Sequence, residues 1–512
     1  MDVRSLMRRS ARYHADRVAV VHGERRVSFA DAWERGCRVA NGLRGLGLDS
    51  QDRIGVLEIN SVGAADLFAG AAAANLVKVP LYPRNRREAH VHMLSHTGCR
   101  ALVVDGALAD EAEGLLDAVP SLEHVVVRDD GYEDWLAAQD PTDPDPAVDA
   151  DDHLIIRHTG GTTGLPKGVA YTHRSWLAAG RDWFYLFPPV EPGDACLHVG
   201  PISHGSGYFF VPIWLAGATN VLLDHFDPDL VLDTWERESI GYGFMVPTML
   251  NSVVRHPAIE DREFPALKCL QIGGSPIADD TARRAHDVLG DRLWQGYGQT
   301  EAVPVAMMSP GQWFAAVEGS EPLRSAGMLL PFADLEIRDE EGNEVPVGES
   351  GEIVVRCDGQ MSGFWEDADA TAERIVDGWV RSGDIGRVDA NGYLYVLDRA
   401  GDMIISGGFN LYPAEIENVL TEHPDVVEAA VFAVPSDRWG ESPRAVCTVV
   451  DGSTVTGDEL VALVGERLGS YQRPVAVDLT ADPLPKSPVG KIMRKQLREP
   501  HWAGHDRRVS GS

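Results

Sequence analysis

Short apolar runs alternate with longer segments of helical spacing in the first part of the chain, and this alternation constrains the fold most strongly. The runs RIGVL (53–57) and VKVPL (77–81) predict strands, and a helix rich in small residues is expected between them, over 64–76. Strand-like runs at 101–104 and 124–127 repeat the pattern. Strands that alternate with helices favour an α/β architecture with mostly parallel sheets.

The chain has 512 residues, which is too long for one ordinary core. Short strands separated by glycine turns over 335–397 predict a small β-rich subdomain, whereas the Asp-, Pro- and Gly-rich stretch 128–152 predicts a solvated loop. We therefore expect a large N-terminal domain, 1–399, built of α/β subdomains plus the β-rich part. A small α+β domain, 400–512, is expected to follow it.

Charge and cysteine usage exclude several classes of function. There are 78 acidic and 46 basic residues, a formal net charge of −32, which repels nucleic acid and anionic lipid. An anionic ligand therefore needs a local pocket of N–H groups, Lys, Arg or metal. The six cysteines form no C-x-x-C pair, so buried thiols in a reducing compartment are expected.

Neither a secretion signal nor a membrane span is expected. No uninterrupted apolar region follows Arg8 and Arg9. The longest apolar candidate, 67–77, is shorter than the ~20 residues that cross a bilayer. These observations predict a cytoplasmic enzyme with no nucleic-acid partner.

A glycine- and threonine-rich loop, TGGTTGLPKG, spans 159–168 and is suited to holding phosphate groups. Glycines let backbone N–H groups converge on an anion, threonine hydroxyls add donors, and Lys167 adds charge. The loop is not a Walker A motif, because Pro166 precedes the lysine and Gly168 follows it.

With the following Val169, this loop closely resembles the signature of the adenylate-forming superfamily. The superfamily contains acyl- and aryl-CoA synthetases, firefly luciferase and the adenylation domains of nonribosomal peptide synthetases. Gly160 stands where the family usually has Ser, which removes a hydroxyl but keeps the N–H. The resemblance implies that Thr163 is catalytic and that ATP phosphates bind to Thr159, Gly160, Gly161, Thr162, Gly164 and Lys167.

Further motifs follow in the family's order. PISHGSG (201–207) resembles the motif whose histidine, here His204, gates the acid pocket. IGGSP (272–276) resembles the turn that contacts adenine, and GYGQTE (296–301) resembles the strongest central motif. The resemblance implies a Mg²⁺ ligand and catalytic group in Glu301. It implies nucleotide contacts by Gly274, Ser275, Pro276, Gly296, Tyr297 (stacked on adenine), Gly298 and Thr300 (on phosphate).

The later motifs are similar to the family's ribose, hinge, thiol and lysine segments. Asp384 would accept the ribose hydroxyls, Arg399 would approach the ribose, and Gly401 would be the hinge. PKSPVGKI (485–492) places Lys491 as the catalytic lysine. The residues implied in CoA binding are Ser406, Gly407, Gly408, Arg438 and Trp439.

The chemistry implied by the resemblance has two half-reactions, with ATP, Mg²⁺ and CoA as cofactors. The carboxylate attacks the α-phosphorus of ATP, giving acyl-AMP and pyrophosphate; the mobile C-terminal domain then swings, and CoA takes the acyl group. Gly401 departs from the usual Asp or Lys, and Phe409 stands where relatives often have Glu. Both departures leave adenylation intact and put CoA transfer in question.

The acid is poorly specified, and rival functions stay open. No Asp near 246–248 could pair with an α-amine, and Gly205, Gly207 and Gly243 leave volume, which favours a hydrophobic acid: fatty, aryl or polycyclic. An alternative enzyme would pass acyl-AMP to a separate CoA- or carrier-protein-dependent partner or ligase in natural-product biosynthesis. A non-catalytic nucleotide-binding relative is the other alternative. A serine hydrolase is disfavoured, because Ser206 lacks the G-x-S-x-G frame. A homodimer is among the oligomeric states left open.

Overall fold

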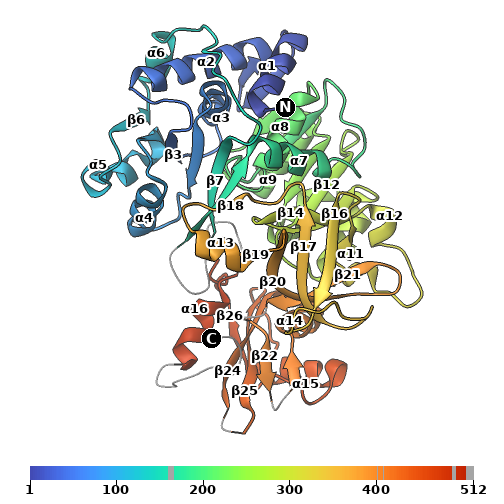
Figure 1. The fold of residues 1–512 in the computed structure, drawn as a ribbon. Helices are drawn as coiled ribbons and strands as arrows, with labels where there is room; N and C mark the ends of the chain where they lie inside the picture. Colours follow the sequence, from blue (N-terminus) through green and yellow to red (C-terminus); the bar gives the residue numbers. More distant parts are fainter. Residues whose placement is uncertain (160–165, 400–401, 407–408, 437, 487–491, 503–512) are drawn as a thin grey trace.

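The computed structural model describes residues 1–159, 166–399, 402–406, 409–436, 438–486 and 492–502. A large N-terminal part contains two sheets with their helices, and a smaller C-terminal part is built around a third sheet (Figure 1). The expected mixed α/β architecture with a large and a small domain is therefore confirmed. The yellow and orange β-rich segments lie between the blue-green helices and the red C-terminal end (Figure 1).

The first sheet has the order β18-β8-β7-β4-β3-β5-β6. The sheet is parallel over β4, β3, β5 and β6, as the alternating sequence pattern predicts. β7 is also parallel to β4. The pair β7 and β8 is antiparallel. The bounds are β3 (Arg53–Leu57), β4 (Val77–Leu81), β5 (Ala101–Asp105), β6 (His124–Arg128), β7 (His153–Thr159), β8 (Lys167–Thr172) and β18 (Gly363–Phe364).

The second sheet has 14 strands, in the order β16-β17-β20-β21-β15-β14-β13-β12-β11-β9-β10-β1-β2, with β19 paired to β20. The strands from β1 to β13 along this order are parallel, and β13 and β14 form an antiparallel pair. The bounds are β1 (Val18–His22), β2 (Arg25–Ser28), β9 (Ala195–His198), β10 (Thr219–Leu222), β11 (Tyr242–Met245), β12 (Cys269–Gly273), β13 (Leu293–Gln299), β14 (Ala302–Met308), β15 (Gly327–Leu329), β16 (Ala333–Arg338), β17 (Gly351–Cys357), β19 (Ile375–Val376), β20 (Trp379–Val388) and β21 (Tyr393–Arg399).

The β-rich segment expected over 335–397 has its own hydrophobic cluster, which includes Ile353, Val355 and Val380. It is nevertheless not a separate sheet. Its strands β16, β17, β20 and β21 continue the hydrogen bonding of the second sheet through β15 and β14. The parallel strands and the β-rich strands are thereby joined in one sheet.

Helices cover both sheets and begin where the sequence provides caps. The Ser28 side chain accepts from the Asp31 N–H at the start of α2. Small residues let α2 and α3 approach closely, since a Cβ at Gly36 would lie 2.8 Å from the Ala69 Cβ. The helices of the large part are α1 (Val3–Tyr13), α2 (Phe29–Gly45), α3 (Val62–Ala74), α4 (Arg87–Thr97), α5 (Leu115–Ala118), α6 (Tyr132–Ala137), α7 (His173–Trp183), α8 (Gly207–Leu215), α9 (Pro228–Arg237), α10 (Pro247–Val254), α11 (Asp279–Leu289), α12 (Pro310–Trp313) and α13 (Ala368–Arg374), with 3₁₀ turns at Gly106–Ala112, Pro257–Ile259 and Pro322–Arg324.

The loop prediction for 128–152 was wrong in its first half, which contains α6. Tyr132 and Leu136, four residues apart, are buried against the helical layer, and the Tyr132 hydroxyl bonds to Asp66 at 3.3 Å. One apolar pair at helical spacing therefore outweighs the polar composition around it. After the helix the segment has no regular structure, and Asp143 anchors it through an ion pair with the buried Arg4.

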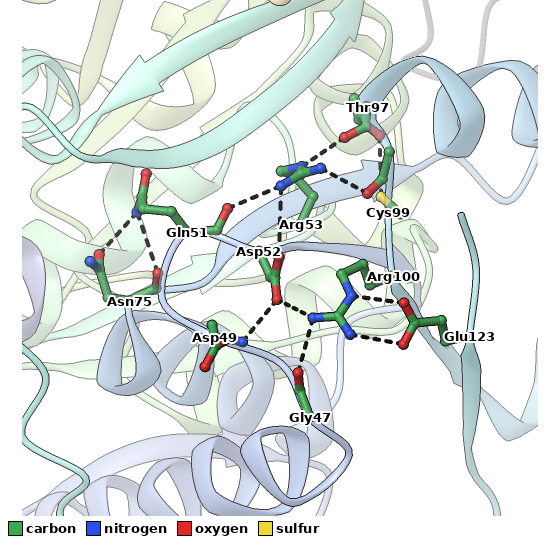
Figure 2. Close-up of polar contacts among 11 residues, drawn as sticks. Gly47, Asp49, Gln51, Asp52, Arg53, Asn75, Thr97, Cys99, Arg100 and Glu123 are labelled. Atoms are coloured by element: carbon green, nitrogen blue, oxygen red, sulfur yellow. Dashed lines mark hydrogen bonds and ion pairs between the residues drawn. The ribbon is translucent and has the colours of Figure 1, made fainter. Parts of the chain in front are cut away.

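Two arginines hold together the amino ends of the parallel strands of the first sheet. Figure 2 shows Arg53 donating to the Thr97 carbonyl (2.8 Å). Its guanidinium also donates to the Gly98 carbonyl at 3.0 Å. In the same view Arg100 pairs with Asp52 (2.6 Å) and Glu123 (2.8 Å). These contacts tie β3, β5 and β6 at the end of the sheet opposite to the one where open α/β sheets bind ligands.

The C-terminal sheet has the order β23-β22-β25-β24, with β26 paired to β25. An ion pair of 3.9 Å between Arg324 and Glu422 connects this part to the larger one. The bounds are β22 (Ile404–Ser406), β23 (Phe409–Leu411), β24 (Val426–Ser436), β25 (Gly440–Val449), β26 (Val477–Thr480), α14 (Pro413–Thr421), α15 (Gly457–Leu468) and α16 (Arg494–Trp502).

Two further expectations bear on the function class. All six cysteines are buried and unpaired, as predicted. Among the described residues, no helix is both long and apolar enough to span a membrane.

Candidate active site

The glycine- and threonine-rich loop connects two antiparallel strands at one end of the first sheet. Thr159, the last residue of β7, faces Lys167, the first residue of β8. The Lys167 ammonium lies 4.0 Å from Asp367, and its side chain is about half exposed at 47%. Five residues of the predicted phosphate-binding set lie outside the described residues, namely Gly160, Gly161, Thr162, Thr163 and Gly164.

Three imidazoles lie behind the base of this loop. His92 and His96 of α4 and His158 of β7 have ring centroids 5.5 to 6.4 Å apart. A ring nitrogen of His92 lies 3.0 Å from the Pro166 carbonyl oxygen. Burial, and then the neighbouring imidazoles, lower the pKa of His158 to about 3, so that this ring is neutral at pH 7. His158 therefore adds no positive charge beside the phosphate loop at pH 7.

The residues expected to hold the nucleotide converge on Asp384 of β20. The Tyr297 hydroxyl donates to an Asp384 carboxylate oxygen at 2.6 Å, and the Gln299 side-chain amide donates to the same oxygen. Asp384 is buried, and its backbone pairs with that of Arg399 on β21. Tyr297, Asp384 and the Arg399 backbone, which are up to about a hundred residues apart in the chain, thus lie close together, while their contacts to a nucleotide stay predictions.

The predicted metal ligand, Glu301, follows β13 in the turn before β14 and is 8% exposed. The guanidinium of Arg374, at the end of α13, lies 3.2 Å from the Glu301 carboxylate and 3.2 Å from the Gln299 amide oxygen. A buried carboxylate oxygen is the donor type that Mg²⁺ takes in nucleotide sites, so Glu301 fits that ion. Thr300 is held beside it, since its carbonyl accepts from the Tyr171 hydroxyl at 2.5 Å.

The GGSP turn lies next to the GYGQTE motif. Gly273 at the end of β12 pairs with Gly296 of β13. Gly274 has φ +90°, a backbone conformation that favours glycine and directs the chain away from the strand. Ser275 is half-buried and Pro276 is exposed.

His204 lies at the carboxyl ends of the first sheet's strands. One of its ring nitrogens is 3.3 Å from the hydroxyl of Tyr82, which directly follows β4. Its carbonyl accepts from the buried Arg157, whose guanidinium stacks on Trp176 (4.6 Å) and Tyr208 (4.4 Å). This places His204 on a rigid support.

Consecutive residues of β13 face two different environments. Tyr297 points toward Asp384, whereas a Cβ at the preceding Gly296 would lie 2.6 Å from the Gln271 amide nitrogen and 2.9 Å from the Trp183 ring. The side of Gly296 is aromatic: Phe209 lies 5.8 Å from Trp183 and 5.9 Å from Phe244, between ring centroids. One strand therefore separates the side of Tyr297 and Asp384 from a side on which Trp183 and the Gln271 amide pack.

The C-terminal candidates are only partly described. Lys491, Gly401, Gly407 and Gly408 lie outside the described residues. Ser406 of β22 pairs with Gly440 of β25, next to Arg438 and Trp439 in the sequence. The Arg438 guanidinium lies 4.4 Å from the ring centroid of Trp439, which is 47% exposed. Ser406 is thus close to the segment that contains Arg438 and Trp439. Lys486 and Ile492, which flank Lys491 in the sequence, form a β-bridge.

Comparison with known proteins shows what this arrangement is. The model of the AMP-binding enzyme family matches residues 7–365, and that of the AMP-binding enzyme C-terminal domain matches 415–491. The chain belongs to the AMP-binding enzyme family. A feruloyl-CoA synthase from an Amycolatopsis species is 37% identical over 500 residues, covering 96% of this chain and 97% of the relative.

Two other similar proteins are named for reactions that do not transfer the acyl group to CoA. A fatty acid–[acyl-carrier-protein] ligase, ScoC of Streptomyces coeruleorubidus, is 32% identical over 96% of this chain and 95% of its own. The amide bond synthetase McbA of Marinactinospora thermotolerans has a similar structure, with a TM-score of 0.87 and 29% identity over 97% of this chain and 99% of its own.

The sequence motifs did not identify two polar residues, Arg374 and Gln271. Arg374 belongs to none of the motifs, and only its position in ATAER, shortly before the WVRSGD segment, placed it near the ribose motif. Gln271 looked like an ordinary strand residue two positions before the GGSP turn. Their contacts depend on tertiary packing, so no local pattern identifies them.

Acid should weaken the fold through His158. The unfolded imidazole binds a proton near its ordinary pKa of 6.5, whereas the folded one does so only near pH 3. Stability is therefore lost as pH falls from about 6.5, by up to about 1.4 kcal/mol per pH unit for this one proton. In His158→Met, the free energy of unfolding measured by urea denaturation should fall less steeply between pH 6.5 and 4 than in the wild type. The difference should be up to about 1.4 kcal/mol per pH unit. An unchanged slope would contradict this.

Arg374→Ala should weaken ATP binding. The variant leaves the buried Glu301 carboxylate and the Gln299 amide without their shared donor, and such charged hydrogen bonds contribute about 1.5–3 kcal/mol. We expect the calorimetric Kd for Mg·ATP to rise roughly ten- to a hundredfold, with partial recovery in Arg374→Lys. Arg381→Ala, which removes an exposed pair with Glu352, is the matched control. Equal affinities in the Arg374 and Arg381 variants would show that Arg374 does not position the site.

Proposed function

We propose that this enzyme, an AMP-forming acid–thiol ligase of the acyl-CoA synthetase type, activates a hydrophobic carboxylic acid. ATP converts the acid to acyl-AMP and pyrophosphate, and the acyl group is then transferred to CoA. The observation that carries the proposal is the two-sided strand β13. Its Tyr297 reaches the polar Asp384, while its Gly296 faces aromatic side chains, so one strand borders both reactants.

The chain's own residues would organise the first half-reaction. Tyr297 and Asp384 would bind the adenosine, with Arg399 near the ribose, and the loop 159–168 would hold the phosphates. Mg²⁺ on Glu301 would neutralise phosphate charge. Arg374 would keep Glu301 and Gln299 in place until the metal and nucleotide bind.

The main electrostatic difficulty is that a carboxylate must approach a phosphate. Lys167 and, by its family motif, Lys491 would supply positive charge, and Thr163 and Thr300 would supply hydrogen-bond donors. Holding the acid and the α-phosphorus in line could remove up to roughly 7–11 kcal/mol from the barrier. No protein nucleophile is needed in this scheme.

For the second half-reaction we propose two domains, 1–399 and 400–512, that rotate about Gly401. Glycine permits a wide range of backbone angles, which suits a hinge. Ser406, Gly407, Gly408, Arg438 and Trp439 would then border the CoA path. The stacked Arg438 and the exposed Trp439 ring support such a role, because an exposed cation and ring can bind a nucleotide.

An aromatic acid is the substrate class that the site favours among the hydrophobic acids considered. Trp183, Phe209 and Phe244 line the side of Gly296, and the feruloyl-CoA synthase relative is named for an aromatic acyl group. A cytoplasmic location stays a prediction, and so does a homodimer.

A second candidate function is transfer to an acceptor other than CoA. The departures at Gly401 and Phe409 favour it, and so do the names of two relatives, a fatty acid–[acyl-carrier-protein] ligase and an amide bond synthetase. In that case the enzyme would make acyl-AMP and pass the acyl group to a carrier protein or a partner enzyme.

A panel of acids with and without CoA decides between these functions. We expect acid-dependent pyrophosphate release with aromatic acids, and accumulation of a CoA thioester, followed by chromatography, when CoA is present. Pyrophosphate release with acyl-AMP but no thioester would favour the second candidate. No release with any acid would contradict the proposed function.

Lys491→Ala should abolish most of the first half-reaction. Its positive charge is expected to stabilise the transition state, so acid-dependent ATP–pyrophosphate exchange should fall on the order of a hundredfold or more. Lys495→Ala is the matched control, because this nearby lysine is half exposed and pairs with Glu499 at 3.7 Å. Unchanged exchange in Lys491→Ala would remove the lysine from the mechanism.

A further inference from the structure

The segment between β9 and α8, which carries the PISHGSG motif, is held by a side chain from the first sheet. Asn60, which follows β3, is buried, and its amide nitrogen donates to the carbonyls of His198 (3.1 Å) and Gly200 (2.9 Å). The amide oxygen of Asn60 accepts from the Ile202 N–H at 2.9 Å. One side chain therefore fixes the backbone that leads to His204.

The backbone of His204 itself is also fixed. Its N–H donates to the Pro201 carbonyl at 2.9 Å, and its carbonyl accepts from the Gly207 N–H at 3.0 Å. The buried guanidinium of Arg157, on β7, donates to the same carbonyl. With the backbone held in this way, the side-chain torsions of His204 decide where its two ring nitrogens point.

Tyr82 contacts the imidazole of His204 from the end of β4. The two rings meet edge-on, with centroids 5.4 Å apart and an interplanar angle of 85°, and the Tyr82 hydroxyl lies 3.3 Å from His204 Nδ1. Tyr82 is buried and anchored, because its carbonyl accepts from the Asn85 N–H at 2.8 Å and lies 3.0 Å from a ring nitrogen of His90. Its hydroxyl is therefore a fixed point for the His204 ring.

The single proton of this hydroxyl determines which ring nitrogen of His204 is protonated. The hydroxyl also lies 3.2 Å from the His158 carbonyl oxygen, which can only accept, so it donates there. Donation to His204 instead would leave two oxygen atoms 3.2 Å apart with no proton between them. Burial raises the pKa of Tyr82 to about 12, so the hydroxyl keeps its proton at pH 7. Nδ1 of His204 must then carry a proton and donate it to Tyr82.

We infer that Tyr82 is a positioning residue for His204, which it holds in one ring orientation with the proton on Nδ1. In the neutral ring Nε2 is then an acceptor, and it lies across the ring from Tyr82. The functional part of this inference rests on the proposed function, in which His204 borders the acid. An acid that needs one orientation of the ring binds more tightly when that orientation is already populated.

NMR of enzyme labelled with ¹⁵N in the histidine rings observes the tautomer directly, because protonated and unprotonated ring nitrogens have well-separated shifts. The His204 signals are those that disappear in His204→Gln. At about pH 9, where imidazoles are neutral, the wild-type enzyme should show a protonated Nδ1 and an unprotonated Nε2. In Tyr82→Phe, which removes only the hydroxyl, the proton should move at least partly to Nε2, the nitrogen that carries it in most free histidine.

Tyr132→Phe is the matched control. Tyr132 is also buried, and its hydroxyl bonds at 3.3 Å to Asp66, whereas the Tyr82 hydroxyl lies at 3.3 Å from His204. The control removes one buried hydroxyl from the same domain without touching the PISHGSG motif. The His204 signals should therefore be the same in Tyr132→Phe as in the wild type.

Kinetics of pyrophosphate release test the functional part, with ferulate as the acid, or the fastest acid of the panel where ferulate is not used. Tyr82→Phe should raise the KM for the acid roughly three- to tenfold and leave kcat and the KM for ATP within about twofold. In a His204→Gln background the same substitution should have no further effect, because the ring that Tyr82 positions is gone. A general loss of packing would add to the effect of His204→Gln instead.

An unprotonated Nδ1 in the wild-type spectrum would overturn the inference, even if Tyr82→Phe failed to fold. So would an unchanged tautomer in folded Tyr82→Phe, or an equal effect of this substitution with and without His204. A rise in the acid KM of Tyr132→Phe as large as that of Tyr82→Phe would overturn it as well. No pyrophosphate release with any acid would overturn the proposed function alone, since the spectrum reports the tautomer without any substrate.

Discussion

The alternation of side chains along β13 is the constraint on which the rest of the candidate site depends. Successive residues of a strand point to opposite faces and advance only about 3.3 Å along it. Tyr297 therefore reaches Asp384 on one side, while the lack of a side chain at Gly296 lets Trp183 and Gln271 pack against the other side. If the nucleotide lies against Tyr297 and the acid against Gly296, the two ligands are close to each other. Because the strand separates them, they can meet only where the strand ends. Thr300 and Glu301 occupy that turn.

Electrostatics explains why the positive groups of the site are local and few. The whole chain carries a net charge of −32, so its general field opposes ATP and a carboxylate alike. His158 adds no positive charge, because burial keeps its ring neutral. Arg157 is fully buried and its guanidinium is occupied by the His204 carbonyl and two aromatic rings. Arg374 is different, because it contacts the motif side chains Gln299 and Glu301 directly.

Much of the fold could be predicted from the sequence, because strands such as 53–57 and helices such as 457–468 carry strong local patterns. The family motifs also pointed to Tyr297, Asp384 and Arg399; the structure places the first two beside the Arg399 backbone, while their contacts to a nucleotide stay predictions. The helix α6 was missed because its apolar pair is hidden in a polar stretch. The continuity of the β-rich strands with the second sheet was missed because strand pairing across distant segments leaves no local signal. Arg374 and Gln271 were missed for the same reason. Lys491 and Gly401 lie outside the described residues, so their roles stay predictions.

In the proposed function, Gly296 would couple the acid subsite to the nucleotide subsite. Any side chain at this position would place a Cβ 2.6 Å from the Gln271 amide and 2.9 Å from the Trp183 ring, closer than carbon atoms pack. The strand could relieve such contacts only by moving, and a movement of β13 would also shift Tyr297 away from Asp384. The packing on this face of β13 thus requires a glycine within the motif. Under the proposed function, the motif would therefore separate two subsites and would not serve the nucleotide alone.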